Sequence, residues 1–122
     1  MKKFILILAI SMIMILTGFQ PGFADTPCIS SGARTVDGNI YTGPCELCGV
    51  FIQTDGANPA IMVGIYDNDD AASGNLLMPQ ITVAATNHYG GFFPNLTIKA
   101  EHGLYLDAGT NLIVIVYYRV NP

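Results

Sequence analysis

The segment from Leu112 to Val120 carries the strongest strand pattern in the chain. Successive side chains of a β-strand point to opposite faces of the sheet, and here apolar side chains occupy both faces. A strand of this kind is typical of the centre of a sheet that is covered on much of both sides. One face would carry Leu112, Val114, Val116 and Tyr118, and the other Ile113, Ile115, Tyr117 and Arg119.

Shorter runs of the same kind, separated by turn residues, make up the rest of the chain after residue 24. No window carries the i, i+3, i+4, i+7 apolar stripe of an amphipathic helix over three turns. Glycine, asparagine, threonine and proline also recur too often for long helices. Seven or eight short strands at this spacing predict an all-β fold, a single antiparallel β-sandwich of jelly-roll or immunoglobulin-like size. The nine apolar or alternating runs from which these seven or eight strands would form cover residues 34–36, 39–42, 48–53, 61–66, 76–84, 92–94, 96–100, 104–106 and 112–120.

A succession of strand and turn patterns between residues 49 and 119 resembles small β-sandwich proteins of tailed bacteriophages and related elements. The matching segments are GVFIQTDG (49–56), VGIYD (63–67), AASG (71–74), GLYL (103–106) and VIVYYR (114–119). Those proteins are virion structural or uncharacterised proteins, so the resemblance implies a β-sandwich with a structural role. A secretion signal departs from that family, because virion proteins normally assemble in the cytoplasm.

The first 24 residues have the layout of a bacterial secretory signal. Two lysines precede an uncharged apolar run over residues 4–19, and small residues lead to the expected cleavage point after Ala24. That run is shorter than the roughly 20 residues that a membrane-spanning helix needs, which favours cleavage over an anchor. We therefore expect residues 1–24 to be a signal peptide and residues 25–122 to be one β-sandwich domain, secreted or periplasmic.

The domain is acidic. Residues 25–122 contain three basic and nine acidic side chains, which gives a net charge of −6. So few cations cannot neutralise a row of phosphates, so we expect no nucleic-acid partner. Binding to anionic membrane surfaces is disfavoured for the same reason. A protein partner or self-association is the expected mode of interaction, with carbohydrate as a further candidate ligand.

Cys45 and Cys48 form a CxxC motif, and Cys28 is the third cysteine. In thiol-disulfide enzymes such a pair begins a helix, whose N-terminus stabilises the thiolate. Here residues 49–52 predict a strand instead, so redox catalysis is the last of our hypotheses. A structural zinc site needs four ligands, and the three cysteines would have to recruit His88 or His102 as the fourth.

Asp37-Gly38 is the preferred dipeptide of a two-residue hairpin turn. A hairpin there would pair Arg34 with Tyr41 and, extended outward, would set Cys28 opposite Leu47. Cys28 would then lie within a residue or two of both Cys45 and Cys48, inside the separation that a disulfide tolerates.

This register favours a disulfide from Cys28 to either Cys45 or Cys48, ahead of a local bridge between Cys45 and Cys48. Closing a loop of this length stabilises a small domain by about 3 kcal/mol in the chain-entropy model. One cysteine stays unpaired in every arrangement. It either lies in the core or forms a bridge to a second molecule.

The densest acidic cluster is Asp67-Asn68-Asp69-Asp70. Asp67, Asp69 and Asp70 are candidate calcium ligands, since carboxylates at close spacing suit this ion. An EF-hand would need glycine at the sixth position and glutamate at the twelfth, where the chain has Ala72 and Met78. A solvated loop in which Asp and Asn favour turn geometry is the preferred interpretation, and a loose calcium site is the alternative.

No hydrolase motif is present, and His88 and His102 stand in expected loops beside glycines. Aromatic rings can stack on sugars, so the tyrosines are candidates for a sugar-binding face, with half-buried packing as the simpler interpretation. The six are Tyr41, Tyr66, Tyr89, Tyr105, Tyr117 and Tyr118.

We therefore expect a secreted structural or interaction module that assembles or binds a surface, with no catalytic activity. The first alternative is a carbohydrate- or calcium-binding extracellular module. The second is a thiol-disulfide oxidoreductase that uses Cys45 and Cys48. No cofactor is expected other than calcium under the first alternative, and no motif indicates which residues bind a ligand.

Overall fold

The computed structural model describes residues 26–54, 56, 58–85 and 90–120, and the expected signal peptide lies outside them. These residues form ten strands and no helix, which confirms the all-β prediction. A helix that could cross a membrane is accordingly not found in the described part of the chain. The strands are β1 (Ile29–Arg34), β2 (Gly38–Thr42), β3 (Cys45–Thr54), β4 (Ala60–Asp67), β5 (Asn75–Met78), β6 (Ile81–Val83), β7 (Gly91–Phe93), β8 (Ile98–Ala100), β9 (Gly103–Ala108) and β10 (Leu112–Val120).

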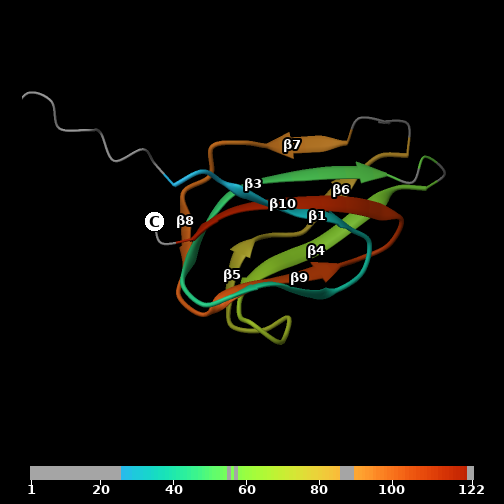
Figure 1. Ribbon diagram of the computed structural model, residues 1–122. Coiled ribbons are helices and arrows are strands. Elements are labelled where there is room, and N and C mark those ends of the chain that lie inside the picture. Colours follow the sequence, from blue (N-terminus) through green and yellow to red (C-terminus); the bar gives the residue numbers. More distant parts are fainter. Residues whose placement is uncertain (1–25, 55, 57, 86–89, 121–122) are drawn as a thin grey trace, which may run out of the picture.

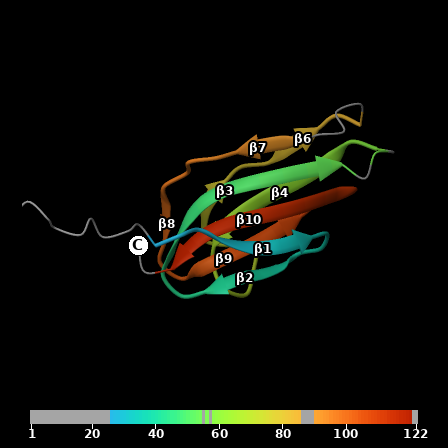
Figure 2. The ribbon, with the colours of Figure 1, turned by 45° about the horizontal axis from the view of Figure 1, so that its top comes forward.

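The strands form two antiparallel sheets that pack face to face (Figures 1 and 2). We call them the β3–β10 sheet, with the order β1-β10-β3-β7, and the β4–β9 sheet, with the order β2-β9-β4-β5. β8 also pairs with β3, and β6 also pairs with β4. β7 and β8 share one position beside β3, and β5 and β6 share one position beside β4, so the ten strands fill eight positions. Their distribution between the two sheets is that of a jelly roll. The predicted β-sandwich is confirmed.

The hairpin predicted around Asp37-Gly38 is wrong. β1 pairs with β10 and β2 pairs with β9, so residues 35–37 carry the chain from one sheet to the other. Gly38 is the first residue of β2 and pairs with Leu106. The turn preference of this dipeptide is local, whereas each segment gains a ladder of backbone hydrogen bonds by pairing with β10 or β9 in a different sheet.

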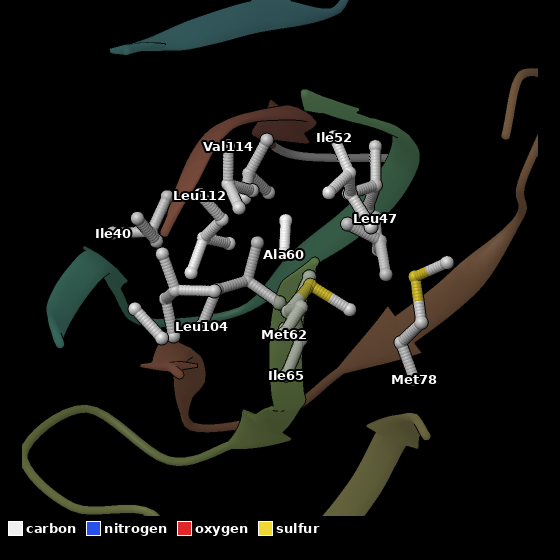
Figure 3. Packing of buried hydrophobic residues seen from close by; sticks show 14 of the residues in the cluster. Ile40, Leu47, Ile52, Ala60, Met62, Ile65, Met78, Leu104, Leu112 and Val114 are labelled. Atoms are coloured by element: carbon white, nitrogen blue, oxygen red, sulfur yellow. The ribbon is translucent and has the colours of Figure 1, made fainter. Parts of the chain in front are cut away.

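The core lies between the two sheets and is built from the inward faces of their central strands (Figure 3). The side chains of alternate residues enter it, as the period of two predicts. β10 contributes Leu112, Val114 and Val116, each at most 4% exposed. The largest fully buried side chains are Leu47, Ile52, Met62, Ile65, Leu104 and Leu106.

A β-bulge interrupts the pairing of β3 with β10. Tyr117 pairs with Gly49 and Tyr118 pairs with Leu47, so Cys48 is an extra residue on β3. Leu47 and Val50 both reach the core although they are three residues apart. The bulge absorbs the odd residue and leaves Cys48 outside the core cluster, on the outer face of the sheet.

Gly103 begins β9 at the corner where the chain passes from the β3–β10 sheet to the β4–β9 sheet. Its φ of 151° is a conformation that side chains rarely adopt, and a methyl group there would overlap the carbonyl oxygen of Tyr41. We expect Gly103→Ala to lower the free energy of unfolding by about 2 kcal/mol or more, from strain and overlap together.

Gly38→Ala is the matched control, because no atom lies within 4 Å of a methyl group at that position. Alanine is better than glycine inside a strand, so this variant should be unchanged or up to about 1 kcal/mol more stable. Chemical denaturation of both variants measures the difference. Equal free energies of unfolding for Gly103→Ala and Gly38→Ala would contradict the steric requirement for glycine at position 103.

Candidate functional site

The outer face of the β3–β10 sheet carries an apolar and aromatic patch. Antiparallel sandwiches usually present polar side chains to solvent on such a face. Here β10 places Ile113, Ile115 and Tyr117 there, all half-buried, opposite the core-facing Leu112, Val114 and Val116. β3 adds Phe51, and the edge strand β7 adds Phe92, which is 59% exposed. We call Phe51, Phe92, Ile113, Ile115 and Tyr117 the aromatic face.

The three rings of the aromatic face contact one another in a row. The centroid of Phe92 lies 6.4 Å from that of Phe51 and 6.4 Å from that of Tyr117. Phe92 and Tyr117 meet edge to face, with 80° between the ring planes. This geometry is favourable for aromatic pairs and holds the exposed Phe92 ring in one place.

At one end of the aromatic face the surface is hollowed into a groove of about 340 Å³. Its apolar lining combines aromatic rings with the sulfur-bearing residues of a disulfide, and its polar lining consists of an amide, a hydroxyl and a guanidinium group. The residues are Cys28, Cys48, Gly49, Phe92, Pro94, Asn95, Leu96, Thr97, Tyr117 and Arg119.

The bulge in β3 fixes one side of this groove. The carbonyl oxygen of Cys48 accepts a hydrogen bond of 2.7 Å from the backbone N–H of Leu96, which attaches the connection between β7 and β8 to the bulge. Gly49 allows this close approach, because a methyl group there would lie 3.0 Å from the carbonyl oxygen of Phe93. Asn95 stands in this connection with a φ of 60°, a conformation that asparagine adopts more readily than most residues.

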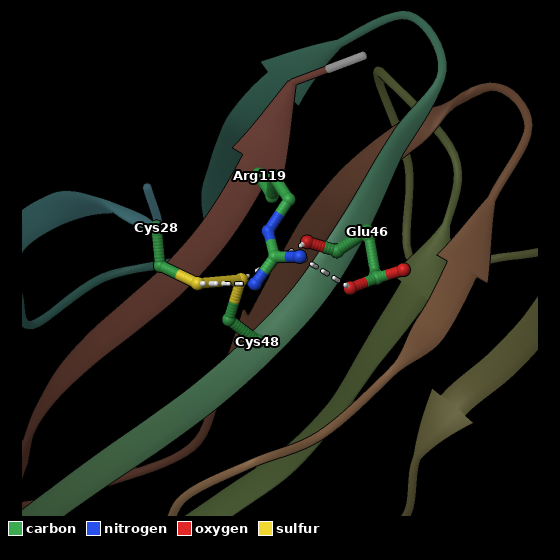
Figure 4. Close-up of a disulfide and its surroundings, with 4 residues drawn as sticks. All are labelled: Cys28, Glu46, Cys48 and Arg119. Carbon is green, nitrogen blue, oxygen red and sulfur yellow. Dashed lines mark hydrogen bonds and ion pairs between the residues drawn. A yellow bond between two sulfur atoms is a disulfide. The ribbon is translucent and has the colours of Figure 1, made fainter. Parts of the chain in front are cut away.

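A disulfide joins Cys28 to Cys48, with the two Cα atoms 6.3 Å apart (Figure 4). It is one of the two pairings that the sequence favoured, although the hairpin used to reach it does not exist. Cys28 precedes β1 and Cys48 lies on β3, and both strands are neighbours of β10. The disulfide therefore ties the start of the sandwich across the end of β10.

Arg119 lies against this disulfide with its hydrogen-bonding capacity incompletely used (Figure 4). Its Nη2 is 3.6 Å from Sγ of Cys28, and its Nη1 is 3.8 Å from Oε1 of Glu46. Nε is buried and has no hydrogen-bond partner among the described residues. Sulfur is a weak acceptor and 3.8 Å is long for an ion pair, so the guanidinium charge is only partly compensated.

Cys45 is the unpaired cysteine and lies in the core at 1% exposure. Cys45 and Cys48 project to opposite faces of β3, because they are three residues apart on a strand. The CxxC motif thus does not bring its two sulfur atoms together, and Cys48 is bonded to Cys28 instead. Burial raises the pKa of the Cys45 thiol to about 11, and the nearby charge of Asp67 adds to this shift. Cys45 is a buried thiol and is not exposed to a second molecule.

Asp67 is a structural acceptor at the same corner as Gly103. Its carboxylate accepts hydrogen bonds from the backbone N–H groups of Glu101 at 3.0 Å, His102 at 2.8 Å and Gly103 at 3.3 Å. Burial raises the pKa of this carboxyl, but the three N–H donors and the His102 imidazole lower it by more, and the pKa lies below its usual value.

The other calcium candidates, Asp69 and Asp70, follow Asp67 in the chain. Asp69 and Asp70 are exposed in the following loop, where Asn68 organises the backbone through bonds to Ser73 and to the N–H of Asp70. Among the described residues, no group of three or more His, Cys, Asp and Glu side chains is arranged to hold a metal ion. His102 lies beside Asp67, with 3.5 Å between Nδ1 and Oδ1, and His88 lies outside the described residues.

The tyrosines are divided among different surfaces. Tyr66 pairs with Tyr105 in the β4–β9 sheet, on the face away from the core. Tyr41 and Tyr118 pack against the core with their ring centroids 5.2 Å apart. Tyr117 belongs to the aromatic face, and Tyr89 lies outside the described residues. The described tyrosines therefore do not form one sugar-binding face. The most exposed ring of the aromatic face belongs to Phe92.

We expect Asp67→Asn to lower the free energy of unfolding at pH 7 by about 2 to 3 kcal/mol. The amide would direct an NH2 group at backbone N–H donors. Because the pKa of Asp67 is lowered on folding, its contribution is complete above the ordinary carboxyl pKa of about 3.9 and is lost as the pH falls through the lower pKa of the folded protein.

Asp70→Asn is the control for this variant, since Asp70 is exposed and should change stability by less than about 0.5 kcal/mol. Urea denaturation at pH 7 and at a series of lower pH values measures both. The difference in free energy of unfolding between Asp67→Asn and Asp70→Asn should become smaller as the solution becomes more acidic. A pH-independent gap would contradict the proposed role of the carboxylate.

Thiol accessibility tests the cysteine arrangement. Under non-reducing conditions we expect Ellman's reagent to modify almost no thiol in the folded protein, because Cys45 is buried and its pKa is raised. After unfolding in guanidinium chloride, one thiol per chain should react. Peptide mapping should recover Cys28 linked to Cys48, and recovery of Cys28 linked to Cys45 would contradict the structure.

Comparisons of the chain with protein-family models, with curated proteins and with solved structures gave no match. The resemblance to bacteriophage β-sandwich proteins therefore stays a prediction from sequence patterns. Since one fold can serve many functions, the candidate function depends on the groove and the aromatic face.

Proposed function

We propose that the protein is a secreted, non-catalytic binding module that attaches to a molecule outside the cell through its aromatic face and groove. The observation that carries this proposal is the position of Phe92. Its ring is 59% exposed beside a groove, on a sheet face where a sandwich usually presents polar side chains. An exposed aromatic ring beside a largely apolar groove is typical of a binding site.

The cysteines support an extracellular setting and a role without catalysis. A disulfide between Cys28 and Cys48 is compatible with an oxidising compartment, as is the signal-like pattern of residues 1–24. The remaining thiol, Cys45, is enclosed in the core with its pKa raised, so it is poorly suited to act as a nucleophile.

The groove favours attachment to a surface over assembly of the protein with itself. A sheet-to-sheet dimer would need a flat, continuous apolar area, whereas this face is hollowed at one end and carries Arg119 and Asn95 there. Polar groups placed at the edge of an apolar hollow are typical of ligand sites, where they fix the orientation of the bound molecule.

Sedimentation with the insoluble envelope of the producing cells tests this proposal. We expect the wild-type protein to sediment with the envelope and Phe92→Ser to bind at least about tenfold more weakly, which corresponds to loss of an aromatic anchor worth about 1.4 kcal/mol. Leu76→Ser is the matched control, because Leu76 is 52% exposed on the other sheet. It should bind within twofold of the wild type.

Light scattering after size-exclusion chromatography, with and without reductant, should show a monomer. If the wild-type protein is a dimer and Phe92→Ser dissociates it, the result would contradict surface attachment and would indicate self-association through the same face. A protein that neither sediments with the envelope nor self-associates would overturn the proposal.

A further inference from the structure

The ligand chemistry of the groove follows from three groups, and this inference rests on the proposed function. The first group is the aromatic corner of Phe92 and Tyr117, whose rings meet at 80°. An apolar flat surface must lie against the exposed Phe92 ring to remove it from water. The C–H face of a sugar ring is flat and apolar, while its hydroxyl groups point outward, so it can cover the ring without desolvating those hydroxyls.

The second group is the guanidinium of Arg119. Residues 25–122 contain only three basic side chains against nine acidic ones, so a cation at a groove in this domain is a local feature against an acidic background. Its present partners are a sulfur atom at 3.6 Å and a carboxylate oxygen at 3.8 Å. Nη1 and Nη2 each carry two N–H groups and have one weak partner apiece, so this end of the planar guanidinium can bind a carboxylate through two parallel hydrogen bonds.

The third group is the polar edge formed by Asn95 and Thr97, both exposed and both lining the groove. An amide and a hydroxyl can each donate and accept, which matches the mixed donor and acceptor character of sugar hydroxyls. The groove volume of about 340 Å³ lies at the lower end of the range for small-molecule sites, enough for one or two sugar units.

We infer that the groove binds a carboxylate-bearing saccharide, with the sugar ring against Phe92 and the carboxylate at Arg119. Asn95 and Thr97 then bind ring hydroxyls. A neutral sugar would leave Arg119 only partly compensated, and a simple carboxylate would leave Phe92 exposed, so both features are needed for full affinity. The ligand class is therefore a uronic-acid-type unit of an extracellular polysaccharide.

Calorimetric titration with a short oligogalacturonate and with its fully methyl-esterified counterpart tests the inference. Esterification adds one methyl group to each carboxyl and removes its negative charge, while the sugar rings stay the same. The wild-type protein should bind the acid at least about tenfold more tightly than the ester, and raising the salt concentration should weaken binding of the acid alone.

Arg119→Met should bind the two probes with equal affinity, because it keeps the apolar stem and removes the charge. Lys99→Met is the matched control: Lys99 lies on β8 opposite Glu46 and does not line the groove, so the preference for the acid should stay within twofold of the wild type. Phe92→Ala should weaken both probes about tenfold, as expected for loss of a stacking platform.

Melting temperatures of all variants establish that they are folded. If Arg119→Met does not fold, the inference is still tested by the salt dependence of acid binding to the wild-type protein and by the affinities of Phe92→Ala for the two probes. Equal binding of acid and ester by the wild type would overturn the inference, as would a preference for the acid that survives Arg119→Met.

Absence of binding to galacturonate, glucuronate and sialic acid on a glycan array would also overturn it. That result leaves the proposed function to be judged separately, by sedimentation of the wild-type and Phe92→Ser proteins with the envelope.

Discussion

The pairing of β3 with β10, with its bulge at Cys48, is the constraint on which the rest of the molecule depends. These two strands lie at the centre of one sheet, and their inner faces supply a large part of the core. Without the bulge, the alternation that directs Leu47 inward would direct Val50 outward. The extra residue lets both enter the core, and its own side chain remains on the outer face, where it bonds to Cys28. One local irregularity thus positions the core, the disulfide and the floor of the surface groove.

The fold class could be predicted from the sequence because it depends on local periodicity. β10 has apolar side chains at every position from Leu112 to Tyr118, and the structure places it between two neighbouring strands, as that pattern predicts. The hairpin at Asp37-Gly38 failed because a turn preference is local, whereas β1 and β2 each pair with a strand of a different sheet. Two strands that are adjacent in sequence can be separated between the sheets of a jelly roll, and no feature of residues 34–42 reveals which neighbour each will choose.

The candidate site could be predicted only in part. The CxxC motif drew attention to Cys45 and Cys48, and the period of two already implied that their side chains point to opposite faces. The groove could not be predicted from the sequence, because it forms only when the connection after β7 lies on the bulge of β3. That contact joins Leu96 to Cys48, which are nearly 50 positions apart. One signal was present in the sequence: Arg119 shares a strand face with Ile113, Ile115 and Tyr117. A charge at the end of an apolar outer face is unusual enough to single out that face.

Apart from the Cys28–Cys48 disulfide, which also lines the groove, the residues that stabilise the sandwich differ from those that form the groove, and this separation bears on function. Stability comes from the side chains between the sheets, from Asp67 at the corner and from the disulfide. Phe92 is 59% exposed, so most of its apolar surface contributes little to folding, and a polar residue could occupy that position at small cost. Arg119 has an Nε that is buried without a partner among the described residues, which is unfavourable for the isolated fold. Under the proposed function, a bound, partly apolar anion would cover the exposed Phe92 ring and supplement the weak partners of Arg119 Nη1 and Nη2, whereas the buried Nε lies out of its reach.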